Sequence, residues 1–168
     1  MGSLSNQEII NHIQEAFPNL LVSSQESYGM MTIEVQANQV KNLFQFLYSN
    51  PALQFQFLTD LCGIHFPDQS GKELGVVYHL HSLVNNYRIR IKAFIPKSNP
   101  QIESVCSIFK SANWQERETF DFYGIEFLGH PNLKRILNVD EMNYFPLRKE
   151  YPLEDQHRTD KNDSYFGR

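Results

Sequence analysis

Cysteine is scarce in this chain of 168 residues, and long apolar runs and an excess of basic charge are absent. Its two cysteines, Cys62 and Cys106, stand far apart and match no metal-binding or redox spacing. We interpret both as reduced core residues, which fits a cytoplasmic compartment. No run of about 18 apolar residues exists, so we expect no membrane-spanning helix. The formal net charge of −4 argues against nucleic acid as the main partner, because phosphate binding needs a basic face.

The N-terminal segment lacks the features of a targeting signal. Residues 1–17 have neither the basic start nor the apolar run of a secretory signal, and they contain no arginine of the kind that mitochondrial presequences use. Asn6 stands where the myristoylation pattern needs a hydroxyl residue. We therefore expect that any association with a membrane comes through other subunits.

Aromatic residues are what the chain has in quantity, with 13 Phe and 8 Tyr. Hydrophobic residues make up 41% of the chain, which is typical of a globular protein rather than a disordered one. At this length, folding buries roughly two-thirds of the surface of the extended chain, enough for one core. Charged residues are only 20%, so the aromatics indicate either a Phe-rich core or a surface that meets a partner.

Helical spacing of apolar residues predicts four helices. A capping box over Ser5–Glu8 opens the first helix, and Asn38 caps the second. Pro100 marks the first turn of the third, and Gly124 stands where a left-handed residue ends the fourth. The expected ranges are about 6–17, 38–50, 98–109 and 113–123, with one further turn at 132–137.

Five segments have the composition of strands, and the turn between the last two sets a register. If Asn85 and Asn86 form a two-residue hairpin loop, Leu80 lies opposite Ile91 and His79 opposite Lys92. Gly63 is expected to form a bulge in the third strand. The expected strands are 20–23, 30–36, 55–66, 74–82 and 87–95.

This element order predicts an α+β fold, a two-layer sandwich with helices on one face of a mixed, mostly antiparallel sheet. Residues 1–145 form the globular domain, with residues 114–145 as its most distinctive region. Residues 146–168 carry five basic and five acidic residues and few large apolar ones. They cannot fold alone, so we predict an extended arm that is disordered or ordered against a partner.

Several side-chain groups suggest chemistry, and each has a simpler explanation. His79 and His81 share a strand face and form a possible metal pair, but the expected register places cationic residues opposite them. A sheet with basic and aromatic residues is also compatible with RNA binding, yet the RNA-recognition motif is missing. Lys134-Arg135 and Arg148-Lys149 lack the glycine-rich loop of a phosphate site. We therefore interpret these groups as exposed or interface residues.

The carboxylates of the fourth helix are the remaining candidates for catalysis. Glu118 and Asp121 share a helix face, whereas Glu116 points about 160° away from Glu118 at 100° per residue. General acid/base pairs need carboxyl groups that converge in a pocket. Arg117 and Asp121 are four residues apart and can form an ion pair. A solvated helix face or interface ion pairs explain this pattern better than catalysis.

The segment Trp114–Pro152 holds an ordered series of residues: Glu116-Arg117-Glu118, Asp121, Gly124-Ile125, Phe127, Gly129-His130-Pro131, Leu133, Arg135-Ile136-Leu137, Asp140 and Pro146-Leu147-Arg148-Lys149. Taken in this order, these residues resemble the C subunit, or 30 kDa subunit family, of proton-pumping NADH:quinone oxidoreductase, respiratory complex I. The chain departs from the family at Met142, Tyr144 and Glu150, in or beside the loop around Pro146.

The resemblance implies a subunit without a cofactor or active site, in a complex whose partner subunits hold FMN and iron–sulfur clusters. Its expected partners are the D subunit, which helps form the quinone site, and the B and I iron–sulfur subunits, with the arm along the D subunit. The expected location is the cytoplasmic side of a bacterial inner membrane, reached only through the complex. The residues it implies as structural or interface residues are Glu116, Arg117, Glu118, Asp121, His130, Arg135, Arg148 and Lys149.

Two other functions remain open. Membrane-bound hydrogenases and F420H2- or ferredoxin-linked dehydrogenases have similar C-type subunits, so the resemblance does not fix the electron donor. A stand-alone binding domain is the alternative from another class, and it would need no large partner.

Overall fold

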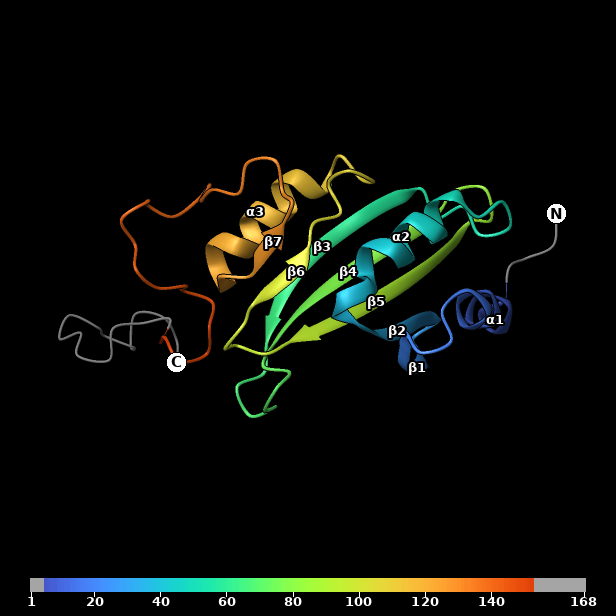
Figure 1. The fold of residues 1–168 in the computed structure, drawn as a ribbon, viewed down its shortest axis with the longest axis horizontal. Helices are drawn as coiled ribbons and strands as arrows, with labels where there is room; N and C mark the ends of the chain where they lie inside the picture. The colour runs from blue at the N-terminus through green and yellow to red at the C-terminus, as the bar shows by residue number, and fades with distance from the viewer. Residues whose placement is uncertain (1–4, 153–168) are drawn as a thin grey trace, which may run out of the picture.

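The computed structural model describes residues 5–152, which form an elongated α+β domain (Figure 1). The predicted fold class is confirmed, while part of the predicted arm, residues 153–168, lies outside the described residues. The elements are α1 (Asn6–Ala16), β1 (Leu21–Ser27), β2 (Met30–Gln36), η1 (Ala37–Gln39), α2 (Val40–Ser49), β3 (Phe57–His65), β4 (Leu74–Ser82), β5 (Tyr87–Ile95), β6 (Gln101–Glu103), α3 (Ala112–Tyr123) and β7 (Glu126–Leu128).

The main sheet has five strands in the order β1-β2-β5-β4-β3. All its pairings are antiparallel except that between β2 and β5, which run parallel. The parallel pair requires a crossover, and α2 lies in the connection between β2 and β3. β1 and β3 are therefore the two edge strands of this sheet.

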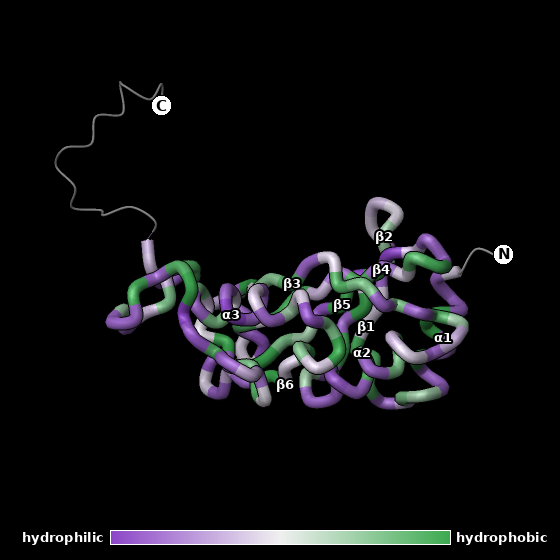
Figure 2. Tube along the Cα trace, turned by 90° about the horizontal axis from the view of Figure 1, so that it is seen from above, coloured by the Kyte–Doolittle hydropathy of each residue, from purple (hydrophilic) through white to green (hydrophobic). Residues whose placement is uncertain are grey.

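One face of the sheet is packed and the other is polar. The packed face is apolar along β4 and β5, as at Tyr78 and Ile91, and it is covered by α2 and α3 (Figures 1 and 2). The Phe44 ring of α2 meets Tyr78 edge to face, with the ring centroids 4.7 Å apart. His79 and Arg90 lie on the opposite face, where no helix packs within residues 5–152. This alternation is what a sheet with one buried face requires.

The start of the chain folds as its sequence predicts. Ser5 Oγ accepts a bond from the Glu8 N–H, and the Glu8 carboxylate accepts one from the Ser5 N–H, which completes the predicted capping box. The α1 helix buries Ile9 and Ile13. The second helix also forms, but Asn38 does not cap it, because η1 leads directly into α2 and no side chain caps that helix.

The predicted third helix is wrong. Residues Gln101–Glu103 form β6, which pairs in parallel with β7, and turns follow up to α3. The apolar spacing of Ile102, Val105 and Phe109 fits a helix, but these side chains are buried from a strand and a turn instead. The further helical turn expected at 132–137 does not form either.

The predicted hairpin register is wrong by two residues. The loop between β4 and β5 has four residues, 83–86, so Leu80 pairs with Ile89 and His79 with Arg90. The Asn85 side chain donates to the backbone oxygens of Ala52 and Leu53, a distant contact that holds the longer loop. A shift of two residues keeps every side chain on its predicted face.

Gly63 is not the site of the bulge in β3. The irregularity in the β3–β4 register lies between Leu58 and Asp60. Gly63 lies under α3 instead, where an added Cβ would approach Tyr123 Cδ2 to 2.5 Å. The glycine is therefore needed for close packing of helix on strand.

Candidate functional site

The distinctive segment forms one end of the molecule, built on α3 (Figure 1). This helix buries polar side chains where a core helix would bury apolar ones, and Glu116, Thr119 and Asp121 are all buried. Gly124 ends it in the left-handed conformation, with φ at 69°, as the sequence predicts. Two buried carboxylates on one short helix must each be satisfied by specific donors.

The Asp121 carboxylate organises the loop that follows β7. Its Oδ2 accepts the backbone N–H groups of Ile136, Leu137 and Asn138 at 2.8–3.0 Å. Its Oδ1 accepts from the Asn138 side chain and from Arg135 Nη1, at 3.0 and 2.8 Å. Burial by itself raises the pKa of Asp121, but these hydrogen bonds outweigh it and hold the pKa well below its usual range.

Arg135 extends the hydrogen-bond network of Asp121 to later residues of the chain. Its Nη1 also reaches the Asp121 backbone oxygen at 2.9 Å, and its Nη2 donates to the backbone oxygens of Met142 and Tyr144. The guanidinium is nearly buried, since its side chain is only 10% exposed. Arg135 therefore fixes residues 142–144 against α3, and the ion pair expected between Arg117 and Asp121 does not form.

Phe145 is clamped between the end of α3 and two guanidinium groups. Arg135 and Arg148 place their Cζ atoms 5.1 and 4.7 Å from the centre of the ring. A Cβ on Gly124 would clash with the same ring, so the helix must end in glycine for Phe145 to fit. Arg148 Nε donates to the Tyr123 backbone oxygen at 2.7 Å.

Residues 146–152, which we expected to begin the arm, are docked on the domain. The Lys149 N–H donates to His65 Nδ1 at 2.9 Å, and Glu150 forms an ion pair with Lys97 at 2.7 Å. Burial lowers the pKa of His65, and its Nδ1 is already an acceptor. The approach of Glu150 to His65 at 3.7 Å is therefore not an ion pair at neutral pH.

Arg117 lies on the exposed side of α3 and has no carboxylate partner within residues 5–152. Its guanidinium stacks over the Trp114 ring, with 4.8 Å from Cζ to the ring centre. It also donates to the backbone oxygens of Lys134 and Arg135 at 3.2 and 3.4 Å. It joins α3 to the loop at the surface, where Trp114 remains 64% exposed.

At the other end of α3, Glu116 is fully buried among neutral donors. Its two oxygens accept bonds from Ser104 Oγ, the Val105 N–H and Cys106 Sγ, at 2.6, 2.8 and 3.2 Å. Burial raises the pKa of Glu116, and these bonds offset that only in part. The carboxyl group thus ties the turn after β6 to the helix.

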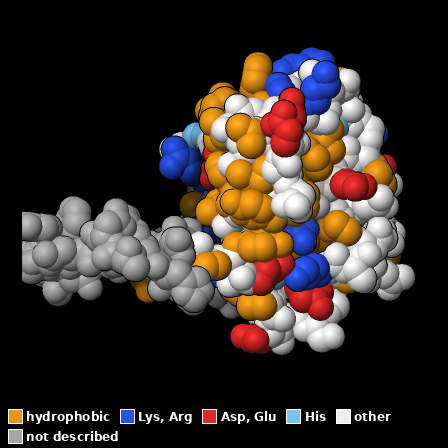
Figure 3. All heavy atoms as spheres, turned by 90° about the vertical axis from the view of Figure 1, so that its left-hand side faces the viewer, with side chains coloured by type: hydrophobic (Ala, Val, Ile, Leu, Met, Phe, Trp, Pro, Cys, Tyr) orange, Lys and Arg blue, Asp and Glu red, His pale blue; other side chains and the backbone are white. Residues whose placement is uncertain are grey.

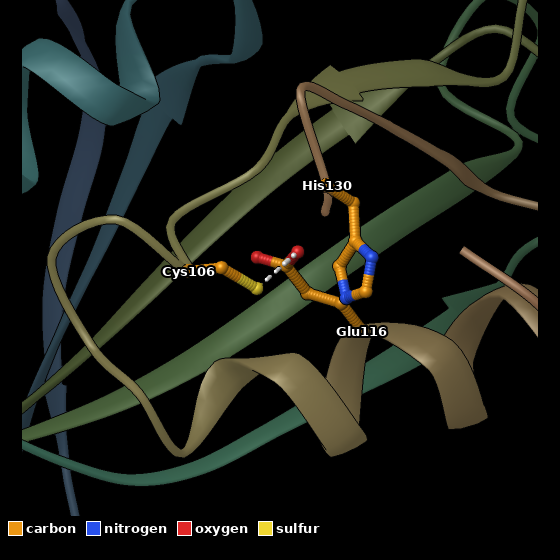
Figure 4. A group of neighbouring side chains, drawn as sticks. All are labelled: Cys106, Glu116 and His130. Carbon is orange, nitrogen blue, oxygen red and sulfur yellow. Dashed lines mark hydrogen bonds between the residues drawn. The ribbon is translucent and has the colours of Figure 1, made fainter. Parts of the chain in front are cut away.

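Cys106, Glu116 and His130 come within 4.8 Å of one another, a spacing that a metal ion would need (Figure 4). Both His130 nitrogens are engaged, however. Nδ1 accepts the Asn132 N–H, so Nε2 carries the proton and donates to the Asn113 oxygen at 3.0 Å. Burial also raises the pKa of the Cys106 thiol to about 12. These residues therefore do not fit a divalent cation, which needs deprotonated ligands with free lone pairs.

The eight predicted residues divide into two groups. Glu116, Asp121, His130 and Arg135 are buried or partly buried and form hydrogen bonds inside the subunit. Glu118 and Lys149 are exposed, and Arg117 and Arg148 are partly exposed. The role of all eight residues at an interface stays a prediction.

Two residues were not singled out from the sequence as part of the site, although the site depends on them. Phe145 is the ring that both arginines contact, and Cys62 is exposed beside α3 rather than buried in the core as predicted. A phenylalanine next to a proline carries no signal of its own. The position of Cys62 on the polar side of an edge strand follows only from the register.

Sequence comparisons place this chain among respiratory proteins. The family model for the 30 kDa subunit of respiratory-chain NADH dehydrogenase matches residues 33–157. The C subunit of NADH-quinone oxidoreductase from Roseiflexus castenholzii is 39% identical over 153 residues, which cover 90% of this chain and 86% of that protein. The C subunit of the same enzyme from Xanthobacter autotrophicus is 38% identical over 145 residues, covering 86% and 68%.

Solved structures share the fold. The trypsin-resistant fragment of Nqo5 aligns with a TM-score of 0.65 and 27% identity, over 77% of this chain and all of that fragment. A chain of the membrane-bound sulfane sulfur reductase, an archaeal respiratory membrane complex, aligns with a TM-score of 0.73 over 88% and 85%. Its identity is 22%, so it shows likeness of fold alone. Within residues 5–152, none of the helices combines the length and the apolar character that crossing a bilayer needs.

Proposed function

This chain belongs to the family of the 30 kDa subunit of respiratory-chain NADH dehydrogenase, and from that membership we propose that it is a non-catalytic scaffold subunit of the peripheral arm. Its work is to hold the subunits that carry electrons from NADH to quinone in register. The proposal includes the D subunit and the B and I iron–sulfur subunits as neighbours, on the cytoplasmic side of a bacterial inner membrane.

The observation that carries this proposal is a firmly braced end surface that leaves apolar side chains exposed. Figure 3 shows apolar side chains gathered on the end of the molecule that lies to the left in Figure 1. Exposed apolar groups gathered on one face are typical of protein interfaces. Large exposed apolar residues of this segment are Trp114, Leu128, Leu137, Val139, Tyr144, Leu147 and Tyr151.

Arg148 is the charged residue of this surface that we expect to matter most. Its guanidinium is partly exposed beside Leu147, and within residues 5–152 it has only a backbone oxygen and the face of Phe145 as partners. A carboxylate of a neighbouring subunit would complete its bonding geometry. If that pair becomes buried, Arg148→Ala should weaken assembly by about 2–5 kcal/mol.

The absence of a cofactor from this subunit is also part of the proposal. Cys106, Glu116 and His130 have the spacing of a metal site, but their side-chain atoms are engaged in internal hydrogen bonds. Their role under this proposal is to hold α3, and no electron or proton transfer step passes through them. Metal analysis of the purified full chain should find no bound metal at a stoichiometric level.

Affinity purification of the complex tests the proposal. Gently solubilised host membranes are purified through a tag on this chain, and the eluate is assayed for NADH:quinone activity and subunit content. A large iron–sulfur complex with that activity supports the proposal. A complex active with hydrogen or another donor would move the subunit to a related complex, and recovery of the chain alone would contradict a scaffold role.

Matched variants make the purification specific to the end surface. Arg148→Ala should lower the yield of intact complex, whereas Lys110→Ala, an exposed residue in the turn before α3, should not. Unfolding of each free chain in denaturant separates lost stability from lost assembly. A normal yield and normal quinone reduction with Arg148→Ala would contradict the role of Arg148.

A further inference from the structure

The unpaired edge of β3 lies against a cleft that borders the braced end surface and shares only Leu147 with its exposed apolar residues. Consecutive residues of β3, Asp60–Gly63, form one wall of this cleft, and α3 forms the other. Its volume is about 240 Å³, which suits one or two side chains rather than a cofactor. The residues of α3 that line it are Glu118, Thr119, Phe122 and Tyr123, and Leu147 closes one side.

The backbone of β3 offers hydrogen bonds to this cleft. Phe66 N donates to the Glu73 oxygen, and bonded pairs alternate along an antiparallel ladder. Cys62 and Ile64 therefore bond to β4, while the N–H and C=O groups of Leu61 and Gly63 point away from the sheet. Within residues 5–152, these outward groups have no hydrogen-bond partner. An edge of this kind is a template for another strand.

The cleft also carries negative charge. Asp60 and Glu118 line it from opposite walls, and neither forms an ion pair with a Lys or Arg within residues 5–152. Asp60 lies 3.6 Å from His79 Nδ1, but burial and the nearby Arg90 lower the pKa of His79. That imidazole is neutral at neutral pH and does not balance Asp60. Both carboxylates, after burial itself, raise the pKa of the Cys62 thiol between them.

We propose that an extended segment of a neighbouring subunit pairs with the edge of β3 and places a Lys or Arg side chain between Asp60 and Glu118. The strand would supply the backbone partners that Leu61 and Gly63 lack, as in recognition by β-augmentation. Its cation would match the two carboxylates. This inference rests on the proposed function, because it assigns a second contact surface to the same scaffold.

Cys62 gives a direct test, because it is exposed and lines the cleft, whereas Cys106 is buried. The purified wild-type complex and the free full-length chain are treated with N-ethylmaleimide, and the modification of Cys62 is followed by mass spectrometry. We expect Cys62 to be modified in the free chain and protected in the complex. Equal rates of modification in both would overturn the proposal.

A charge-reversal pair tests the cation. The double variant with Asp60→Lys and Glu118→Lys should lower recovery of the complex by at least about tenfold, because like charges would then meet in the cleft. Asp68→Lys, in the exposed turn after β3, is the matched control and should assemble normally. Unfolding of the free variants in denaturant shows whether they fold.

The outcomes separate this inference from the function it rests on. If wild-type chain is recovered without partner subunits, the scaffold function itself fails. If the complex is intact but Cys62 reacts as fast in it as in the free chain, or the charge-reversal variant assembles normally, only the β3 contact fails.

Discussion

The two buried carboxylates of α3 lie five residues apart, and their pKa values are shifted in opposite directions. Asp121 receives three backbone N–H groups and an arginine, and its pKa is lowered. Glu116 receives a hydroxyl, a thiol and one N–H, and its pKa is raised. Both side chains are closed off from solvent, and burial raises the pKa of each. The donors around Asp121 outweigh that effect, whereas the fewer, uncharged donors around Glu116 do not.

The two ends of α3 therefore stabilise different segments of the chain. The Asp121 end organises residues 135–148 through a charged centre, and it supports the surface that we expect to meet partners. The Glu116 end fastens the turn after β6 through uncharged donors. Changes that remove the charge should therefore damage the first end far more than the second.

Asp121→Asn should have the largest effect and would break the Asp121 end outright. The amide places a donor among donors and leaves the nearly buried Arg135 without its charge partner, so we expect a loss of about 3–5 kcal/mol in unfolding free energy. Denaturant unfolding of the full chain measures it. Asp140→Asn, an exposed residue of the same loop, should cost little, and equal losses in both would contradict this account.

Gly124→Ala should rank next, because it damages the same end without touching a charge. A left-handed conformation costs a residue with a side chain about 1–2 kcal/mol, and here the Cβ must also displace Phe145. Gly129→Ala is the matched control, since Gly129 has φ at 80° but open space around it. Equal melting temperatures for the two variants would show that the Phe145 clamp does not matter.

Glu116→Gln should cost less, about 0.5–1.5 kcal/mol at neutral pH, because none of the partners of Glu116 is charged and the amide oxygen can still accept some of their hydrogen bonds. The pH dependence sharpens the comparison. A raised folded pKa means that the contribution of Glu116 is complete below its unfolded pKa and is lost as pH rises through the folded value. Denaturant unfolding from about pH 4.5 upward should show this loss in the wild type and not in the variant.

The acid side of the same profile reports Asp121. Its lowered pKa makes its contribution complete above the unfolded pKa, near 4, and lost as pH falls below that value. Glu116→Gln should keep this loss of stability at low pH. If the variant showed neither the loss at low pH nor the loss as pH rises, the assignment of one loss to each carboxylate would be contradicted.

Arg117→Ala should have the smallest effect on the free chain, below about 1 kcal/mol, because its contacts are partly exposed and include no carboxylate. Thermal unfolding checks this value. A loss as large as that of Gly124→Ala would show that the contacts of Arg117 with the loop stabilise the Asp121 end more than their geometry suggests.

Local signals in the sequence were sufficient where the structure is local. The capping box at Ser5–Glu8 and the left-handed Gly124 depend on neighbouring residues, and both predictions are confirmed. The five strands and their faces were also predicted, because alternation of apolar residues survives a change of register. The family resemblance identified the segment around α3 as distinctive from the order of its residues alone.

The errors arise where distant residues decide the outcome. Ile102 belongs to a strand because it pairs with Phe127, which lies far along the chain and outside any local sequence pattern. Asn85 bonds to Ala52 and Leu53 rather than closing a two-residue turn. Asp121 takes Arg135 and three backbone N–H groups instead of the arginine four residues before it. In each case a tertiary contact replaced a local one that the sequence favoured.

The bond from the Lys149 N–H to the His65 ring has a consequence for the order of folding. It closes a loop of more than eighty residues, and its acceptor is in place only when β3 and β4 have paired. Loop closure of this length is slow compared with hairpin formation. We expect the amide of Lys149 to gain protection from hydrogen exchange after β4 and β5, so that the end surface is completed last. During synthesis, the main sheet would then form before the end surface that we expect to bind a neighbouring subunit.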